Sequence, residues 1–168
     1  MQKIIIQIIG ITSISIILGF GRYFVLDEHY NLVKEKRILN SLESGNSDSL
    51  TDCSIPEQLS EPMFIDAEFA FCLYEAGNVI FVDARDPEEF EQLHIKNSIN
   101  IPYDYFEDFM HQIDSINKEI ILVTYCSGGD CSLSIDLADH LFFEADFYKV
   151  LVFEGGFPLW QGKGFPIN

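Results

Sequence analysis

Two cysteines, Cys126 and Cys131, are the residues whose type and spacing most clearly indicate chemistry. Between them lie Ser127, Gly128, Gly129 and Asp130, and Ser132 follows Cys131. A cysteine thiolate is a nucleophile. Two thiols can also pair when a loop brings their Cα atoms to within roughly 4.4–6.8 Å. The segment therefore predicts thiol chemistry at a short, glycine-containing loop.

The flanking residues predict which elements hold this loop. Residues 120–123 form an apolar, β-branched run that ends at Tyr125, which is typical of a buried parallel strand. Leu133, Leu137, Ala138 and Leu141 then recur with a helical period, and Ser132 stands where an N-cap belongs. The loop thus joins the carboxyl end of a strand to the amino end of a helix. Free N–H groups and the helix dipole there favour a thiolate at Cys126, and the glycines let the backbone curl around it.

The rest of the chain repeats this alternation. Predicted strands cover residues 64–65, 79–82, 98–102, 120–125 and 148–153; predicted helices cover residues 66–76, 87–90, 105–113 and 133–141. Strands that alternate with helices favour an α/β fold with a parallel sheet.

Five segments carry a resemblance to a known family. They are residues 82–90, 94–102, 126–131, 154–160 and 164–166. In this order and spacing the chain resembles a single rhodanese domain, a sulfurtransferase fold. The resemblance implies a small parallel sheet with helices on both faces, and it does not extend to the first 60 residues or so.

The resemblance also implies roles for individual residues. Cys126 is expected to carry a persulfide during sulfur transfer, and no cofactor is expected. Asp83 and Arg85 are expected to be structural, with a buried carboxylate and guanidinium holding loops together. Tyr125 and Phe157 could wall the active pocket or simply pack in the core.

The loop departs from the family pattern at its end, where Cys131 stands at a position often occupied by arginine. No arginine or lysine lies in the loop, and Asp130 adds a negative charge. Phosphoryl transfer needs cationic stabilisation, so a phosphatase-like activity is excluded. Thiosulfate is also a dianion, so a persulfide, a polysulfide or a protein thiol suits this loop better as the sulfur donor.

Cys131 leaves two interpretations open: a neutral replacement for arginine, or a second redox thiol that resolves a persulfide on Cys126. The second requires a thiol acceptor or a membrane redox partner to reset the pair. One rival function is a thiol–disulfide redox protein that uses the same pair. Another is a non-catalytic binding module.

The amino-terminal segment predicts a membrane anchor over residues 1–26. No charged residue occurs between Ile4 and Phe20, and the apolar stretch is about 20 residues long, enough to cross a bilayer. A cleaved signal peptide is the alternative, with Lys3 as its basic end. Residues 27–62 have a linker composition with a possible short helix at 32–42, and residues 63–168 form the predicted rhodanese-like domain. The expected arrangement is a single-pass protein with its domain outside the cytoplasm, on the periplasmic side.

Composition excludes some classes of function. A net charge of −17 argues against binding to nucleic acid. The four cysteines contain no Cys-x-x-Cys pair, and no histidine lies close to them in sequence, so no metal site is expected. Cys53 is expected to be an incidental thiol, with a role in pairing as the alternative, and Cys72 is expected to be a small buried side chain in a helix.

Overall fold

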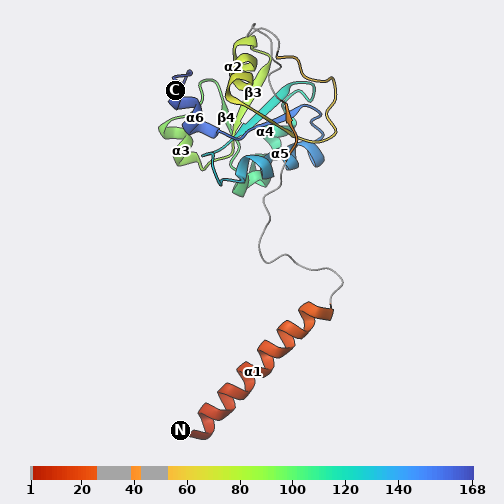
Figure 1. The fold of residues 1–168 in the computed structure, drawn as a ribbon, viewed down its shortest axis with the longest axis vertical. Coiled ribbons are helices and arrows are strands. Elements are labelled where there is room, and N and C mark those ends of the chain that lie inside the picture. Colours follow the sequence, from red (N-terminus) through yellow and green to blue (C-terminus); the bar gives the residue numbers. More distant parts are fainter. Residues whose placement is uncertain (1, 26–38, 43–52) are drawn as a thin grey trace. The chain divides into compact units, whose positions relative to one another are not determined.

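The computed structural model describes residues 2–25, 39–42 and 53–168, which fall into two compact units, residues 1–36 and 37–168 (Figure 1). In the first unit, α1 (Gln2–Val25) forms over the predicted apolar segment. Ile4, Ile11 and Ile17 on this helix are 61%, 66% and 68% exposed. Within the described ranges, no helix is both long and apolar enough to cross a membrane. The anchor predicted over residues 1–26 is therefore not confirmed.

The second unit is built on a parallel sheet, as the alternating pattern predicted. Its described residues form six strands in the order β1-β2-β6-β5-β3-β4, and every neighbouring pair is parallel. The strands are β1 (Ser41–Leu42), β2 (Met63–Ile65), β3 (Val79–Asp83), β4 (Ile99–Asn100), β5 (Ile121–Tyr125) and β6 (Val150–Phe153). The strand that leads to Cys126, β5, lies between β6 and β3, so the loop starts from the centre of the sheet.

Helices connect these strands and cover both faces of the sheet. They are α2 (Ala67–Ala76), α3 (Pro87–Gln92), the 3-10 helix η1 (Tyr103–Phe109), α4 (Met110–Asp114), α5 (Leu133–Phe143) and α6 (Gly156–Gly162). Successive residues of β5 point to opposite faces of the sheet, as in any β-strand. Leu122 belongs to the apolar cluster under α5, whereas Val123 belongs to the cluster that contains Trp160 of α6.

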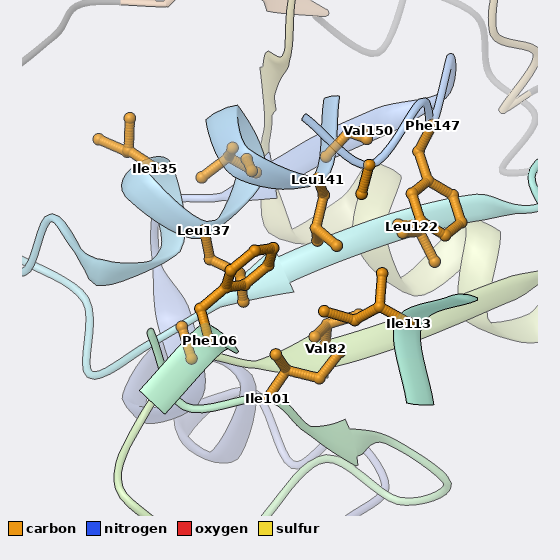
Figure 2. Packing of buried hydrophobic residues seen from close by; sticks show 14 of the residues in the cluster. Val82, Ile101, Phe106, Ile113, Leu122, Ile135, Leu137, Leu141, Phe147 and Val150 are labelled. Carbon is orange, nitrogen blue, oxygen red and sulfur yellow. The ribbon is translucent and has the colours of Figure 1, made fainter. Parts of the chain in front are cut away.

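The cluster under α5 shows how the predicted helical pattern is used. Leu137 and Leu141 are fully buried and point from α5 toward Leu122 on β5 (Figure 2). This packing fixes α5 against the strand that precedes the cysteine loop. Both ends of the loop are therefore anchored in the same core.

Two boundaries differ from the prediction. The helix expected over residues 105–113 is instead the 3-10 helix η1 followed by α4, and η1 itself is kinked at Tyr105 (φ −120°, ψ 21°). In the segment expected to be a linker, Ser41–Leu42 forms the edge strand β1, and Leu39 is buried. The sheet thus continues upstream of residue 63. The short helix predicted at 32–42 is wrong at residues 41–42, and residues 32–38 lie outside the described part of the chain.

Cys72 lies in a helix as predicted, but it is only partly buried and is not a free thiol, and Cys53 takes the pairing role that was the alternative to an incidental thiol. The two residues form a disulfide with a Cα–Cα distance of 6.0 Å and a sequence separation of 19. Cys53 packs at the edge of the apolar cluster that contains Trp160, and it comes from the segment expected to be a linker. The bond ties that segment to α2. A pairing between residues that approach only in the folded chain is not visible in their sequence spacing.

Candidate active site

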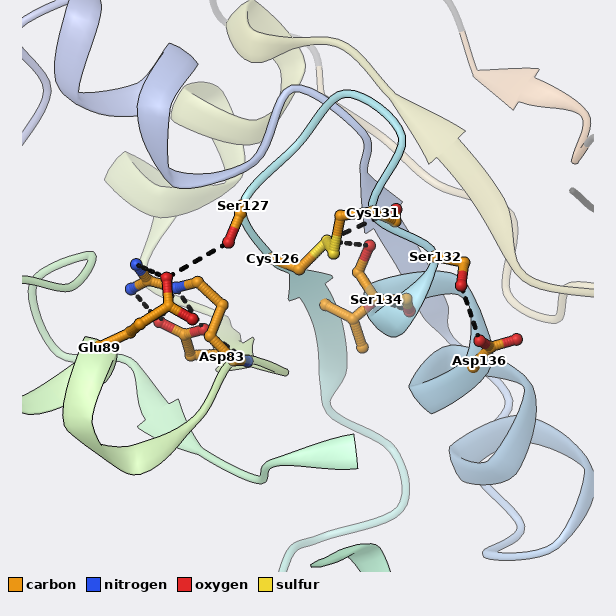
Figure 3. The surroundings of a disulfide bond; sticks show 10 residues. Asp83, Glu89, Cys126, Ser127, Cys131, Ser132, Ser134 and Asp136 are labelled. Atoms are coloured by element: carbon orange, nitrogen blue, oxygen red, sulfur yellow. Dashed lines mark hydrogen bonds and ion pairs between the residues drawn. A yellow bond between two sulfur atoms is a disulfide. The ribbon is translucent and has the colours of Figure 1, made fainter. Parts of the chain in front are cut away.

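The loop from Cys126 to Ser132 lies between the end of β5 and the start of α5, as predicted (Figure 3). Cys126 is only 1% exposed, whereas Cys131 is partly exposed. The amide N–H of Phe157 donates to the carbonyl oxygen of Cys126 at 2.8 Å, and the amide of Cys131 donates to the carbonyl of Gly128 at 3.2 Å. The first bond fastens the loop to α6, and the second curls it.

The curl depends on glycines in the left-handed region. Gly128 and Gly129 have φ angles of 71° and 64°, which side-chain-bearing residues rarely adopt. A Cβ atom on Gly128 would stand 2.5 Å from the carbonyl oxygen of Gly155. The two glycines thus provide the positive φ angles that the curl of the loop requires.

The curled loop brings its two ends together. Cys126 and Cys131 are joined by a disulfide, with their Cα atoms 6.7 Å apart. Together with the Cys53–Cys72 bond, this pairs all four cysteines of the sequence. The arrangement allows either sulfur to be released as a thiolate when another thiol attacks the bond.

Ser134 is a site residue that the sequence analysis did not single out. Its side chain is buried, and its Oγ lies 3.4 Å from Sγ of Cys126 (Figure 3). Ser132, which was singled out, occupies the N-cap position but makes no side-chain cap bond; its hydroxyl donates instead to Asp136 at 3.0 Å. The sequence feature that could have identified Ser134 is its position in the first turn of the predicted helix, since that turn faces the preceding loop.

Asp83 and Arg85 lie on the other side of the loop and form a buried pair. Nη2 of Arg85 donates to Oδ2 of Asp83 at 2.6 Å and to the carbonyl oxygen of Leu93 at 2.9 Å. Burial alone would lower the pKa of Arg85, but the hydrogen bonds and charge of Asp83 outweigh it and raise that pKa. The guanidinium lies over the ring of Phe157, 4.6 Å from its centroid. These contacts are those of a structural group that joins β3, α3 and α6.

A chain of polar contacts connects this pair to the cysteine loop. Nη1 of Arg85 lies 3.7 Å from Oε1 of Glu89, and the hydroxyl of Ser127 donates to the same oxygen at 3.4 Å. Glu89 and Asp130 are both exposed. The charge of Arg85 thus faces Asp83 and Glu89. The exposed carboxylates of Glu89 and Asp130 form what we call the rim of the loop.

Tyr125 and Phe157, the two candidate pocket walls, are both buried. The hydroxyl of Tyr125 accepts from the amide of Ile95 at 3.3 Å and is 2.9 Å from Oγ of Ser98. Burial and the nearby charge of Asp83 raise the pKa of Tyr125 far above its usual value. Tyr125 is therefore a buried core residue whose hydroxyl holds the segment of Ile95 and Ser98 against the end of β5.

Metal binding finds no support in the described part of the chain, where no group of three or more His, Cys, Asp or Glu side chains could hold an ion.

Comparisons with known proteins agree with the geometry. A family model described as a rhodanese-like domain matches residues 72–163. The thiosulfate sulfurtransferase GlpE of Pseudomonas syringae pv. syringae is 35% identical over 97 residues, which cover 58% of this chain and 85% of the relative. The protein of the same name from Coxiella burnetii is 29% identical over 92 residues, covering 55% of this chain and 80% of its own length.

Solved structures show the same fold. The BH2092 protein from Bacillus halodurans superimposes with a TM-score of 0.54 at 23% identity, covering 65% of this chain and 77% of that one. The solution structure of the rhodanese-like domain of the Anabaena protein Alr3790 gives a TM-score of 0.51 at 22% identity, covering 68% and 80%. The expected α/β fold, a parallel sheet flanked by helices, is confirmed.

Proposed function

The chain belongs to the rhodanese-like family, and from this premise we propose that it is a sulfurtransferase that carries sulfane sulfur as a persulfide on Cys126. The observation that carries the proposal is the position of this cysteine. It lies at the carboxyl end of the central strand β5 and before the amino end of α5. Free backbone N–H groups and the helix dipole at such a position stabilise a thiolate.

In the first step, the Cys126 thiolate attacks the outer sulfur of a donor persulfide, R–S–SH. A new bond forms between Sγ and that sulfur, and the donor's S–S bond breaks. The donor leaves as the thiolate R–S⁻, and Cys126 holds an –S–SH group. No net oxidation occurs, because the sulfane sulfur only changes its carrier.

In the second step, the Cys131 thiolate attacks Sγ of Cys126. The bond from Sγ to the carried sulfur breaks, hydrosulfide leaves, and the Cys126–Cys131 disulfide forms. The two thiols lose two electrons, and the sulfane sulfur gains them. A thiol reductant, on a small molecule or on a membrane redox partner, then restores both thiols and is itself oxidised to a disulfide.

Charge at the rim favours an organic persulfide or a polysulfide over thiosulfate. The curated relatives are named thiosulfate sulfurtransferases. In this chain the exposed carboxylates of Glu89 and Asp130 lie at the loop, and the loop itself carries no cation. Thiosulfate would bring two further negative charges to this position.

Intact-protein mass spectrometry tests the proposal directly. The full chain, Cys126→Ser and Cys131→Ser would be reduced, treated with polysulfide and weighed. The expected result is a gain of one sulfur that Cys126→Ser abolishes and that Cys131→Ser retains longer than the wild type. If oxidation removes two hydrogens but no sulfur is ever added, the sulfurtransferase proposal fails.

The disulfide between Cys126 and Cys131 favours a second candidate, a thiol–disulfide redox protein that uses the same pair. Such a protein would exchange its disulfide with a partner's thiols without taking up sulfur. The mass measurement separates the two candidates, because only the first adds a sulfur atom.

We also propose that α1 attaches the chain to a membrane and that the rhodanese-like domain lies outside the cytoplasm. The exposed isoleucines of α1 need an apolar environment. Two disulfides are best maintained in an oxidising compartment. Carbonate extraction of membranes tests the attachment: the chain should remain in the pellet, and release into the supernatant would contradict it. A membrane-impermeant protease added to spheroplasts tests the orientation and should digest the domain.

A further inference from the structure

Ser134 is buried beside the candidate nucleophile. Its side chain belongs to a residue only 2% exposed, and its Oγ lies 3.4 Å from Sγ of Cys126. In the described part of the chain, this sulfur is the one polar atom that its hydroxyl contacts. A buried hydroxyl without a hydrogen bond is unfavourable, so the best partner for Ser134 is an electron-rich sulfur.

The position of Ser134 is fixed by the strand that leads to the cysteine. The hydroxyl of Thr124, two residues before Cys126, donates to the carbonyl oxygen of Ser134 at 2.8 Å. Ile135 and Leu137, which follow Ser134 in α5, are buried in the core against the sheet. The hydroxyl is therefore held near the sulfur by packing and by a backbone bond.

We propose that Ser134 donates a hydrogen bond to Sγ of Cys126 and stabilises its thiolate. This inference deepens the proposed function and rests on it for its role in sulfur transfer. A hydrogen bond to a charged acceptor is stronger than one to a neutral acceptor. The contact thus favours the thiolate over the thiol, and it raises the reactive fraction of Cys126 near neutral pH.

The same contact gives the disulfide a direction of reduction. Cys131 is partly exposed and Cys126 is buried, so an incoming thiolate R–S⁻ reaches Cys131 more easily. Its attack forms an R–S–S–Cys131 bond and breaks the internal bond, and Cys126 leaves as a thiolate. A better-stabilised thiolate is the better leaving group. A second reductant thiolate then attacks the mixed disulfide, which releases Cys131 as a thiolate and R–S–S–R as the oxidised product.

The first test measures the pKa of Cys126 in the full chain. Cys131→Ser keeps Cys126 from forming the internal disulfide, and the rate of alkylation by iodoacetamide is followed from pH 4 to pH 10. Adding Ser134→Ala should raise the pKa of Cys126 by about one pH unit. The rate at pH 6 should then fall about tenfold if that pH lies below both pKa values.

Ser134→Thr is the matched variant, because it keeps a hydroxyl at the same position. It should restore the lower pKa, which a purely space-filling role would not require. An unchanged pKa in Ser134→Ala would overturn the proposal, whatever the threonine variant does. Thermal unfolding of each variant shows whether the fold is retained.

The second test determines the direction of attack. Oxidised wild-type chain is treated briefly with a thiol of distinctive mass, quenched with acid and digested for peptide mapping. The tag should be found on Cys131 and should form more slowly in Ser134→Ala. A tag found mainly on Cys126 would overturn the directional part.

These outcomes are distinct from failure of the proposed function. If Ser134→Ala raises the pKa but polysulfide never adds sulfur to Cys126, the sulfurtransferase proposal fails and the role of Ser134 stands. If sulfur is added to Cys126 but Ser134→Ala leaves its pKa unchanged, the role of Ser134 fails and the sulfurtransferase proposal stands.

Discussion

Gly156 packs directly against the main chain of Cys126. The backbone of Gly156 has a φ of 60°, and a Cβ atom at this position would overlap the carbonyl oxygen of Cys126 and stand 2.6 Å from the amide nitrogen of Gly128. The neighbouring amide of Phe157 donates to that same carbonyl at 2.8 Å. The turn after β6 therefore packs against the backbone of the cysteine loop and helps to fix its conformation.

We predict that Gly156→Ala disrupts the loop as well as the turn. The added methyl group must displace backbone atoms of Cys126 or Gly128, which cannot yield as a flexible side chain would. The expected loss is about 2–4 kcal/mol of unfolding free energy, with a change in the alkylation rate of reduced Cys126. Urea unfolding and iodoacetamide kinetics measure the two effects.

Gly164→Ala is the matched control for that substitution. Gly164 also has a positive φ, 73°, but an added Cβ would meet no atom within 4 Å. It should lose only about 1 kcal/mol and leave Cys126 reactivity unchanged. Equal effects of the two variants on Cys126 would contradict the role given to Gly156.

Arg85→Met is predicted to destabilise the domain strongly. Methionine retains much of the apolar stem, but it leaves the carboxylate of Asp83 buried without its partner. Removing one member of a buried ion pair typically costs about 3–5 kcal/mol. Chemical denaturation of Arg85→Met, Asp83→Asn and the double variant would measure the loss of unfolding free energy in each. If the double variant is not more stable than the sum of the single losses predicts, the two residues are not coupled as described.

Tyr125 should make the domain sensitive to alkali. Its pKa is raised in the folded state by burial and by Asp83, so the folded chain favours the neutral phenol. That contribution is complete below the unfolded pKa of about 10 and is lost as the pH rises above it, by about 1.4 kcal/mol per pH unit. Tyr125→Phe should lower stability at pH 7 by about 1–2 kcal/mol, because the bonds to Ile95 and Ser98 are lost.

The comparison between wild type and Tyr125→Phe isolates this residue from the other tyrosines. Unfolding free energies would be measured in urea between pH 7 and pH 11. The difference between the two proteins should shrink above about pH 10. A difference that stays constant with pH would mean that Tyr125 ionises equally in both states.

The Cys53–Cys72 disulfide should stabilise the second unit without affecting sulfur chemistry. It closes a short loop with a sequence separation of 19, for which the loss on removal is about 3 kcal/mol. The double variant Cys53→Ser, Cys72→Ser should unfold at lower urea concentration and still gain one sulfur from polysulfide. Loss of sulfur uptake in a folded double variant would assign this pair a role in the reaction.

Rim charge should control the choice of donor. Glu89→Gln combined with Asp130→Asn removes two carboxylates without changing side-chain size. The value of kcat/KM for thiosulfate should rise about two- to fivefold at low salt, and the value for a neutral organic persulfide should change less. No preferential gain for thiosulfate would exclude rim charge as the cause of donor selectivity.

The sequence identified the site through local patterns. The buried strand, the glycine-containing loop and the amphipathic helix are each encoded over a few consecutive residues, so the position of Cys126 between β5 and α5 could be predicted. The five family-like segments, in order, were sufficient to predict the parallel sheet. The division of residues 105–113 between η1 and α4, and the kink of η1 at Tyr105, were not visible in the helical pattern of the sequence.

Contacts between distant segments were decided only by the tertiary structure. The Cys53–Cys72 bond, the edge strand β1 and the support of Cys126 by Gly156 all join residues that have no periodic relation in the sequence. Ser134 belongs to the same group: its burial beside the sulfur depends on how α5 packs on β5. Sequence by itself determined that the cysteine loop lies between a buried strand and an amphipathic helix. Folding determined which groups surround them, because long-range packing sets those distances.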